Sequence, residues 1–342
     1  MVMASRLTPG IAPPASAVAR PFWSVMVPVY NRTRFLDRAL SSVLEQDPGA
    51  EQMEIEVVDD ASDQGDAESK VRRIGGGRVQ FYRQPCNLGV PGNWNVCVER
   101  ATGQWVHILH SDDFVLPGFY QRLKSVLETR EDIGAAFCRH AYVDESDLQY
   151  GVSPLESSVS GILPNFIEAI GISQKVQCAA IVVRRIVYEN LGGYRLDLRY
   201  TPDWEMWTRI AAKYPIWYLP ETLAAYRIHS ESYTDQLMRM GQLVPDMRRC
   251  IEACHSYLPL NRAGFITRKA KERTALWALD RASEAIRERR VAAACGYALE
   301  GMRTSSSPRV LIRLVAENFR LAWGGIRWAS RLVQRKWAGC NT

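Results

Sequence analysis

Short apolar runs alternate with helical patterns through the first two thirds of the chain. The runs, rich in β-branched residues, predict strands at residues 23–30, 53–60, 78–83, 104–110, 134–143, 178–185, 216–219 and 223–229. Apolar residues at three- and four-residue spacing predict helices at residues 33–45, 93–101, 118–128 and 203–213. Strands that alternate with helices of about ten residues indicate βαβ units. We therefore expect an α/β fold with a mostly parallel central sheet flanked by helices.

The pattern changes at both ends of this region and predicts four segments. Residues 1–21 contain several prolines, little periodicity and no apolar core of a signal peptide, so we expect a disordered leader. Residues 22–234 carry the alternating pattern and form the predicted α/β domain. Residues 235–304 are rich in Arg, Ala and Glu with almost no strand pattern, which predicts an all-helical extension. Residues 305–342 form the last segment, a basic amphipathic helix.

Composition excludes several classes of protein. The chain has 342 residues, of which 47% are hydrophobic and 23% charged, as in ordinary globular proteins. It has no apolar run of the roughly 18 residues that a membrane-spanning helix needs. Its eight cysteines form no CxxC pair and no zinc-type cluster, so we expect free, buried thiols. The net charge of +6 is concentrated in residues 309–337, and the near-neutral remainder argues against a nucleic-acid binder.

Polar and acidic residues follow three of the predicted strands, at positions 30–31, 59–60 and 110–113. In an open α/β sheet, ligands bind outside the carboxyl ends of the strands. Two acidic pairs on one edge repel each other unless a cation is bound, and hard oxygen ligands suit Mg²⁺ or Mn²⁺. A divalent metal that holds a diphosphate would satisfy both pairs. The alternative is that each pair caps a following helix or turn.

Two common nucleotide-binding motifs are missing from the sequence. It contains no GxGxxG pattern and no GxxxxGK[ST] pattern. The glycine run at residues 75–77 precedes a predicted strand and predicts a turn, not a phosphate-binding loop. Dinucleotide-dependent dehydrogenases and P-loop proteins are therefore disfavoured.

Six motifs in order resemble the inverting family 2 glycosyltransferases of the GT-A fold, whose sheet is Rossmann-like. They are VMVPVYNRTRFLDRALSSVLEQ (25–46), VVDDAS (57–62), NLGVPGNWN (87–95), ATGQWVHILHSDDFVLPG (101–118), LGGYRLDLRYTPDWEMWTRIA (191–211) and LAAYRIHSES (223–232). Each motif alone is weak, but together they span about 210 residues in the family's order and spacing.

The resemblance implies roles for individual residues. Those implied to bind the nucleotide are Pro28, Tyr30, Asp59, Asp60, Asn87, Asn95 and Asp112, with Tyr30 stacking on the base. Asp113 would be the direct metal ligand, and His229 matches a histidine that contacts metal or diphosphate in some relatives. Asp203 matches the catalytic base. The implied cofactor is Mn²⁺ or Mg²⁺.

The sequence departs from the family pattern at two positions. His110 stands where the metal motif often has its first acid, and Pro202 stands where an acid often precedes the base. Asp203 opens a predicted helix, whose dipole favours the ionised carboxylate that a base needs. A single base opposite the leaving group gives inversion. Glu205 is the rival for this role, and a plain N-cap is the structural alternative for Asp203.

The last predicted helix places its basic residues on one side. Six arginines fall within an arc of about 80° at helical spacing, with apolar residues and tryptophans around the rest. The arginines are at positions 309, 313, 320, 327, 331 and 335. Such a helix lies in the headgroup plane of an anionic membrane. The alternative is that it packs on the enzyme's own core.

The combined hypothesis is a metal-dependent inverting glycosyltransferase at the cytoplasmic face of a membrane. It would move a sugar from a UDP- or dTDP-sugar to a glycan or lipid-linked glycan in surface polysaccharide synthesis. A glycosidase would leave Tyr30 and the acids at 59–60 unexplained. Two further alternatives are a nucleotidyltransferase, which would need a basic glycine-rich loop near residues 27–34, and an inactive glycan-binding scaffold.

Overall fold

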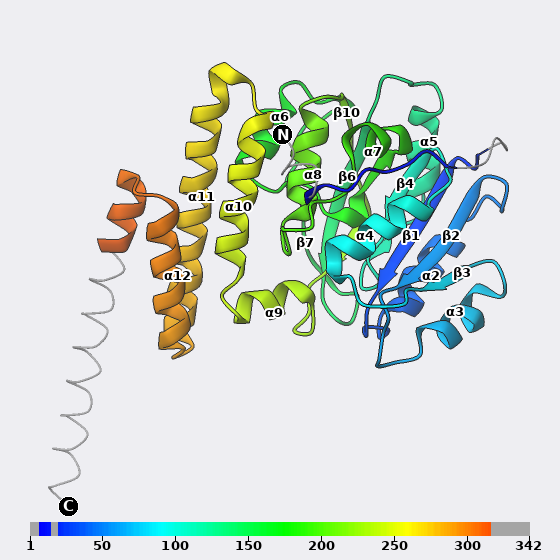
Figure 1. Cartoon of the computed structure of the whole chain (residues 1–342), viewed down its shortest axis with the longest axis horizontal. Helices are drawn as coiled ribbons and strands as arrows, with labels where there is room; N and C mark the ends of the chain where they lie inside the picture. The colour runs from blue at the N-terminus through cyan, green and yellow to red at the C-terminus, as the bar shows by residue number, and fades with distance from the viewer. Residues whose placement is uncertain (1–6, 15–19, 316–342) are drawn as a thin grey trace, which may run out of the picture.

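A ten-stranded sheet forms the centre of the protein in the computed structural model, which describes residues 7–14 and 20–315 (Figure 1). Its main path has the order β3-β2-β1-β4-β9-β6-β10-β5. β1 (Trp23–Val29) pairs in parallel with β2 (Met53–Asp59) and β4 (Trp105–Ile108), and β2 pairs in parallel with β3 (Gln80–Arg83). β1 is buried along its whole length, as expected for a central strand covered on both faces.

The second half of the sheet mixes parallel and antiparallel pairs. β6 (Ala135–Val143) runs parallel to β10 (Ile216–Arg227) over the longest register in the sheet. β9 (Ile181–Arg184) is antiparallel to both β4 and β6. The short strands β5 (Phe114–Val115), β7 (Gln149–Val152) and β8 (Gly161–Ile162) also pair in antiparallel fashion. The predicted α/β fold is confirmed, with a sheet that is mostly parallel and carries antiparallel additions.

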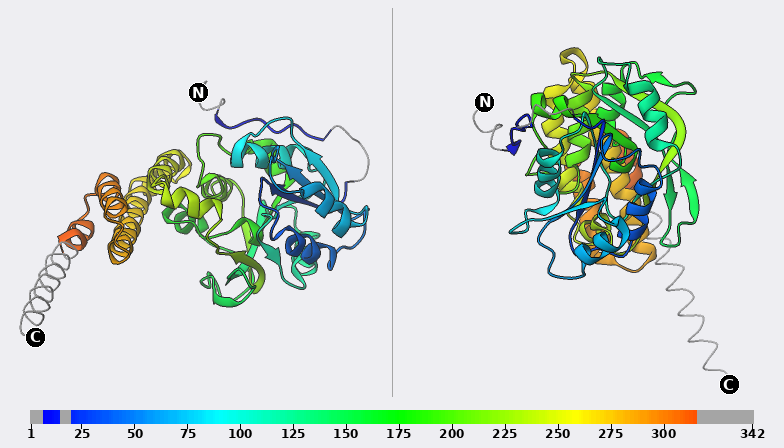
Figure 2. Two further views of the ribbon diagram at one scale, coloured as in Figure 1. Left: turned by 90° about the horizontal axis from the view of Figure 1, so that it is seen from below. Right: turned by 90° about the vertical axis from the view of Figure 1, so that its right-hand side faces the viewer.

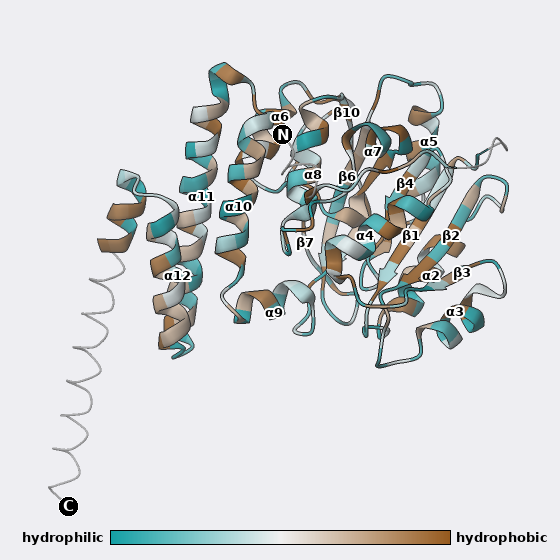
Figure 3. Cartoon of the chain, in the orientation of Figure 1, coloured by the Kyte–Doolittle hydropathy of each residue, from teal (hydrophilic) through white to brown (hydrophobic). Residues whose placement is uncertain are grey.

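Helices cover both faces of the sheet. α2 (Leu36–Leu44), α3 (Ala67–Gly75) and α5 (Phe119–Leu127) share one apolar core with the strands. α4 (Gly89–Arg100), α6 (Phe166–Ile172), α7 (Arg185–Leu191) and α8 (Pro202–Ala211) share the other. Figure 3 shows apolar residues gathered in the central strands between these two layers. This layering leaves the carboxyl ends of β1, β2 and β4 on one edge of the sheet.

Helices also form the C-terminal part: α9 (Tyr233–Arg239), α10 (Leu243–Cys254), α11 (Leu260–Arg287) and α12 (Val291–Thr304). They extend from one side of the sheet (Figure 2). Residues of α10 and α11 belong to the same core cluster as α8, among them Cys250, Ile251 and Ala270. Within the described residues, no helix is both long and apolar enough to cross a bilayer.

The structure differs from the sequence predictions in several places. Residues 216–219 and 223–229 were predicted as two strands, but 216–227 form one strand with an irregular register between Leu219 and Ala224. The helices α3, of nine residues, and α7, of seven, lie outside the predicted helical stretches. Residues 7–14 of the predicted disordered leader pack on the domain, since Ile11 is 4% exposed and the Gly193 N–H donates to the Pro9 carbonyl (2.8 Å).

Only the start of the predicted basic helix lies within the described residues. Residues 308–315 are helical, and Val310 is buried against Ala275 and Leu279 of α11. Arg309 lies 3.6 Å from Glu272 and Arg313 lies 2.8 Å from Asp280, so these two arginines contact acids of α11. Residues 316–337 of the predicted membrane-surface helix lie outside the described residues.

Candidate active site

The loop after β1 carries an exposed aromatic ring to the edge of the sheet. Tyr30 directly follows the strand and is 45% exposed, whereas Pro28 is buried in the strand opposite Val58. Asn31 has a left-handed φ of 57° and its Oδ1 accepts the N–H groups of Asp63 and Gln64, both at 3.0 Å. The loops after β1 and β2 are therefore tied together beside Tyr30.

The acidic pair after β2 is bonded within the protein. The Asp59 carboxylate is fully buried and accepts from Ser62 and from Arg83 Nε (2.6 Å). Asp60 accepts the N–H groups of Leu88 (2.8 Å) and Gly89 (3.0 Å), which begin α4. Burial raises the pKa of Asp60, and the two backbone hydrogen bonds oppose this rise. Asp59 thus holds the β2 loop, and Asp60 holds the start of α4.

The two predicted asparagines occupy different positions. Asn87 is exposed, and its Oδ1 accepts the Gly89 N–H at 2.9 Å. Asn95 is buried in α4, where its amide group donates to the Tyr194 carbonyl (2.9 Å) and accepts the Tyr194 N–H (2.6 Å). Asn95 is therefore bonded to the chain before α8.

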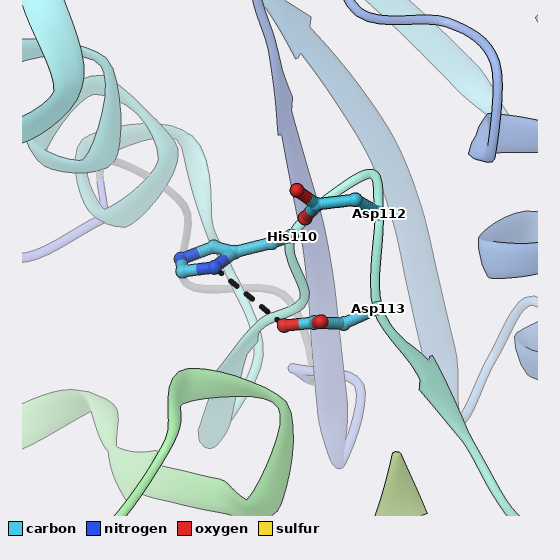
Figure 4. Close-up of side chains that lie close together, drawn as sticks. All are labelled: His110, Asp112 and Asp113. Carbon is cyan, nitrogen blue, oxygen red and sulfur yellow. Dashed lines mark ion pairs between the residues drawn. The ribbon is translucent and has the colours of Figure 1, made fainter. Parts of the chain in front are cut away.

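His110, Asp112 and Asp113 gather in the loop after β4 (Figure 4). One ligand atom from each lies within 4.8 Å of the others. Asp113 Oδ1 accepts the Arg227 N–H at 2.9 Å, and Oδ2 lies 3.7 Å from His110 Nδ1. Among the described residues, this buried Oδ2 has no hydrogen-bond partner. A buried carboxylate oxygen without a partner is costly, and a cation would satisfy it.

The electrostatics of this cluster also favour a cation. Burial, followed by the charge of Asp112, raises the pKa of Asp113 well above its ordinary value. Burial alone would raise the pKa of Asp112, but the His229 hydrogen bond and the charges of His110 and His229 bring that pKa below its ordinary value. Burial lowers the pKa of His110, which favours the neutral imidazole that ligates metals. Two carboxylates and this imidazole therefore fit a divalent cation.

The cluster differs from the predicted metal ligands, which were Asp113 and His229. His229 Nε2 lies 3.1 Å from Asp112 Oδ2, so this histidine contacts the carboxylate of Asp112 and is not part of the cluster. His110 takes the remaining place, and its ring stacks on Trp94 with a centroid distance of 4.9 Å. The residue that departs from the usual acidic motif is therefore a candidate ligand.

Asp203 lies in the first turn of α8 and is half-buried. Its Oδ1 accepts the N–H of Trp204 (2.7 Å), and its Oδ2 accepts from Gln174 Nε2 (2.5 Å). Burial raises the pKa of Asp203 to about 7, although both hydrogen bonds favour the charged form. A carboxylate that titrates near neutral pH is suited to act as a general base.

Glu205, the rival for the role of base, is fully buried on the opposite side of the first turn. Its Oε2 lies 3.0 Å from Arg209 Nη2, and its Oε1 accepts the Tyr257 hydroxyl at 2.7 Å. Both carboxylate oxygens are thus engaged inside the protein. The geometry favours Asp203 over Glu205.

The charges of Asp113 and Asp203 both act on the buried thiol of Cys178. Burial raises the pKa of Cys178, and the charges of Asp203 and Asp113 raise it further, which places both carboxylates near this thiol. Beside them, Asp112, His229 and residues 31–35 line a cleft of about 250 Å³, together with Ser111 and Glu231. Acids that are far apart in the sequence therefore converge on one region.

Sequence reasoning missed two side chains that hold the acids in place. Arg227 is buried, donates from its backbone to Asp113 and from Nε to the Asp112 carbonyl (2.9 Å), and lies over the Phe35 ring at 4.2 Å. Its place two residues before His229 was the available signal. Gln174 contacts Asp203 from the loop after α6, and nothing in its local sequence marks it.

Comparisons with known proteins agree with this architecture. The sequence profile of the family described as Glycosyl transferase family 2 matches residues 24–191. An uncharacterized protein of Mycobacterium tuberculosis is 28% identical over 72% of this chain and 80% of its own length. An uncharacterized glycosyltransferase of Rickettsia typhi is 22% identical over 63% of this chain and 66% of its own length.

Two solved structures have the same fold. TarS of S. aureus, residues 1–349 in complex with UDP, has a TM-score of 0.57 and 17% identity, covering 88% of this chain and 91% of that one. A mannosyltransferase from Pyrobaculum calidifontis in complex with GDP-Man and Mn²⁺ has a TM-score of 0.50 and 20% identity, covering 88% of this chain and 92% of that one. At these identities the likeness establishes the fold.

Fold, strand-end acids and comparisons together define a glycosyltransferase with a GT-A fold. Residues 24–191 form a glycosyltransferase family 2 domain. The family match ends at residue 191, so Asp203, Arg227 and His229 lie beyond it.

Proposed function

We propose that this chain transfers a sugar from a nucleoside diphosphate sugar to a hydroxyl of a glycan or lipid-linked glycan, with inversion. The observation that carries the proposal is the pairing of a cation-type cluster, whose Asp113 has an unpartnered buried oxygen, with a half-buried Asp203 near the same thiol. The donor nucleotide would be UDP or dTDP. Bound UDP and GDP-Man in the two similar structures support a nucleotide-sugar donor.

The donor would bind along the edge of the sheet. Tyr30 offers an exposed ring for stacking on the base, at the end of a rigid buried strand that contains Pro28. Asn87 and Asp112 keep partly accessible polar groups for the ribose or sugar hydroxyls. In this proposal Asp59, Asp60 and Asn95 act through the loops that they hold.

The leaving diphosphate would be bound beside the β4 loop. A divalent cation, Mn²⁺ or Mg²⁺, held by His110, Asp112 and Asp113 would supply Lewis-acid stabilisation of the negative charge on the leaving oxygen. His229 orients Asp112 through its hydrogen bond. Arg32 lines the adjacent cleft and, within the described residues, has no acidic partner at ion-pair distance, so its charge is available to phosphate.

Asp203 would take the proton from the attacking hydroxyl. Its pKa of about 7 leaves a large fraction ionised at neutral pH, and Gln174 fixes the direction of the carboxylate. One base that faces the leaving group across the sugar gives a single in-line displacement and hence inversion. Buried Glu205, paired with Arg209, would not compete for this proton.

The test is calorimetric titration with UDP in the presence and absence of Mn²⁺. We expect UDP binding that depends on Mn²⁺ in the wild type and is lost in Asp113→Ala, with the variant still folded. A panel of UDP-, dTDP- and GDP-sugars then identifies the donor by hydrolysis to the nucleoside diphosphate. Nucleotide binding that is absent, or indifferent to metal, would contradict the proposal and favour the scaffold alternative.

We also propose that residues 309–337 hold the enzyme on an anionic membrane surface, at its cytoplasmic side. In the described part, Val310 docks on α11 while Leu311, Ile312 and Val315 stay exposed. A helix anchored at its start and apolar on its outer side would lie along lipid headgroups. We expect salt-sensitive sedimentation with anionic liposomes that is lost on truncation after Ser307. No sedimentation of the full chain would overturn this part of the proposal.

A further inference from the structure

A buried aspartate outside the site binds the segment that leads into Asp203. Asp246 lies in α10 and is 2% exposed. Its Oδ1 accepts the backbone N–H of Arg199 (3.1 Å), and its Oδ2 accepts those of Tyr200 (2.9 Å) and Thr201 (3.0 Å). The Thr201 hydroxyl also donates to Oδ2 at 2.9 Å. Four hydrogen bonds from three consecutive residues therefore converge on one carboxylate.

This segment ends where the helix of the base begins. Thr201 is the N-cap residue of α8, and its hydroxyl bonds Asp246 of α10 instead of an N–H of its own helix. Asp203 follows two residues later, in the first turn. The start of α8 is thus fixed from outside by α10, and a shift of α10 would move Asp203 with it.

Asp246 accepts more hydrogen bonds than a neutral amide in its place could accept. Three backbone N–H groups, one hydroxyl and Arg249 Nη2 (2.7 Å) all donate to its two oxygens. An amide in its place would offer one accepting atom and would point its own N–H groups at the donors on the other side. Consecutive N–H groups aimed at one anion form the kind of concave site that binds negative charge in other proteins.

The charge of Asp246 also acts on the base. Around Asp203 lie Gln174 from the loop after α6, Cys178 of η1 (Cys178–Ala180), Tyr194 and Tyr200 from the loop before α8, and Asp246 from α10. Burial is the largest cause that raises the pKa of Asp203, and the Asp246 charge adds to it. Around Asp246 itself lie Arg199, Tyr200, Tyr233 and Arg249.

We propose that Asp246 is a positioning residue for sugar transfer: from the C-terminal helices it fixes residues 199–201 and thereby aims Asp203 at the acceptor hydroxyl. The proposal rests on the proposed role of Asp203 as base. It makes α10 part of the catalytic unit, although the family match ends before α8.

The experiment compares Asp246→Asn with Glu252→Gln in the full chain. Glu252 lies on the same helix, is 56% exposed and pairs with Lys271 at 3.6 Å, so it controls for loss of an acid from α10. Three quantities are measured: hydrolysis of UDP-GlcNAc and GDP-mannose with Mn²⁺, amide hydrogen exchange of residues 198–204, and the carboxyl ¹³C titration of Asp203, assigned with Asp203→Asn.

For Asp246→Asn we expect kcat to fall by about 10- to 100-fold with a donor KM within about 3-fold of the wild type, because a misplaced base slows the chemical step alone. Exchange at Tyr200 and Thr201 should become faster. The titration of Asp203 should move to lower pH, because a negative charge beside it has been removed. Glu252→Gln should match the wild type in all three.

Other outcomes identify which idea fails. Wild-type exchange and an unmoved Asp203 titration in folded Asp246→Asn would overturn the proposal without any activity assay. A second outcome would also overturn the proposal: kcat falls, donor binding weakens by the same factor, and the Asp203 titration does not move. That combination would mean that Asp246 has only a structural role. Full turnover in Asp203→Asn would contradict the base assignment instead. If Asp246→Asn does not fold, Thr201→Val carries the test, with Thr201→Ser as its conservative control.

Discussion

The aspartates at the strand ends of this protein differ in whether their carboxylate oxygens have hydrogen-bond partners. The carboxylates of Asp59 and Asp60 accept hydrogen bonds from Ser62, Arg83 and the first N–H groups of α4. Asp113 keeps a buried oxygen without a hydrogen-bond donor among the described residues, beside a histidine of lowered pKa. The second arrangement is the one that could hold a cation. Residue type at a strand end therefore does not decide the role; the hydrogen bonds do.

Asp203→Asn should lower turnover by about 10²- to 10⁴-fold, the usual contribution of a positioned general base. The amide has the same size and cannot accept the proton. Metal-dependent UDP binding should stay within about 3-fold of the wild type, because Asp203 lies on α8 and not on the cluster loop. Steady-state kinetics and calorimetry measure the two quantities. Asp132→Asn, in an exposed pair with Arg130, is the matched control.

The pH dependence gives an independent check on Asp203. Since its pKa is about 7, turnover should fall as the pH drops below about 7 and the base is protonated. A pKa raised on folding stabilises the folded state at low pH, and this stabilisation is lost as the pH rises from about 4 through 7. The melting temperatures of wild type and Asp203→Asn should therefore diverge as the pH rises from about 4 to 7, with the variant melting higher at the upper end of this range. Parallel melting curves across this range would contradict the raised pKa.

His110→Ala tests whether the unexpected histidine is a ligand. Its removal should raise the Mn²⁺ concentration needed for half-maximal UDP binding by about 10- to 100-fold, because one donor of three is lost. His107→Ala is not a suitable comparison, since His107 is buried against Tyr120 and the Ala179 carbonyl. His255→Ala is the suitable comparison, because His255 is exposed in the C-terminal part of the protein. Equal Mn²⁺ dependence in both variants would exclude His110 from the metal site.

At the scale of elements, segments outside the α/β alternation fix the site. Arg227 at the end of β10 and His229 just after it hold the two acids of the β4 loop. Residues 7–14 pack where Gly193 and Leu196 approach α8, through backbone hydrogen bonds from both to Pro9 and Leu7. No local periodicity marks these contacts, because each depends on a distant partner.

Ile11→Ala tests the packing of the N-terminal segment. Because Ile11 is 4% exposed in the main core cluster, its truncation should lower the free energy of unfolding by about 2–5 kcal/mol. Ile312→Ala truncates the same type of side chain at a position that is 69% exposed. This variant should change the free energy of unfolding by less than about 0.5 kcal/mol. Denaturant unfolding of both variants measures the difference. Equal stabilities would mean that residues 7–14 do not pack on the domain in solution.

At the scale of the whole molecule, the α/β domain and the C-terminal helices share one core. Cys250, Ile251 and Ala270 lie in the same apolar cluster as Trp204 and Trp207 of α8. A boundary drawn near residue 235 from the sequence follows the change of pattern, and the packing crosses it. The helix of the proposed base is thus enclosed between the sheet and the extension.

Truncation distinguishes the two parts of the C-terminus. A chain that ends at residue 232 should lose cooperative thermal unfolding, because the apolar face of α8 would be left open to water. A chain that ends at Ser307 should fold and keep donor hydrolysis, since it removes Val310 and Leu314 from a small cluster on α11 and leaves the main core intact. Near-UV circular dichroism during heating measures both. A cooperative melt of the shorter chain near the wild-type temperature would contradict a shared core.

The sequence by itself determined the strand–helix alternation, the family, and the positions of the acids at strand ends. These features are local, because periodicity and short motifs depend on neighbouring residues. Only the tertiary structure decided which acids accept hydrogen bonds from the protein and which keep an oxygen without a partner among the described residues. Asp59 and Asp60 are of the first kind, and Asp113 is of the second. It also decided that Gln174, Arg227 and Asp246 surround the acids. Hydrogen bonds and burial between residues far apart in the chain exist only once the fold has formed, so local sequence patterns do not contain them.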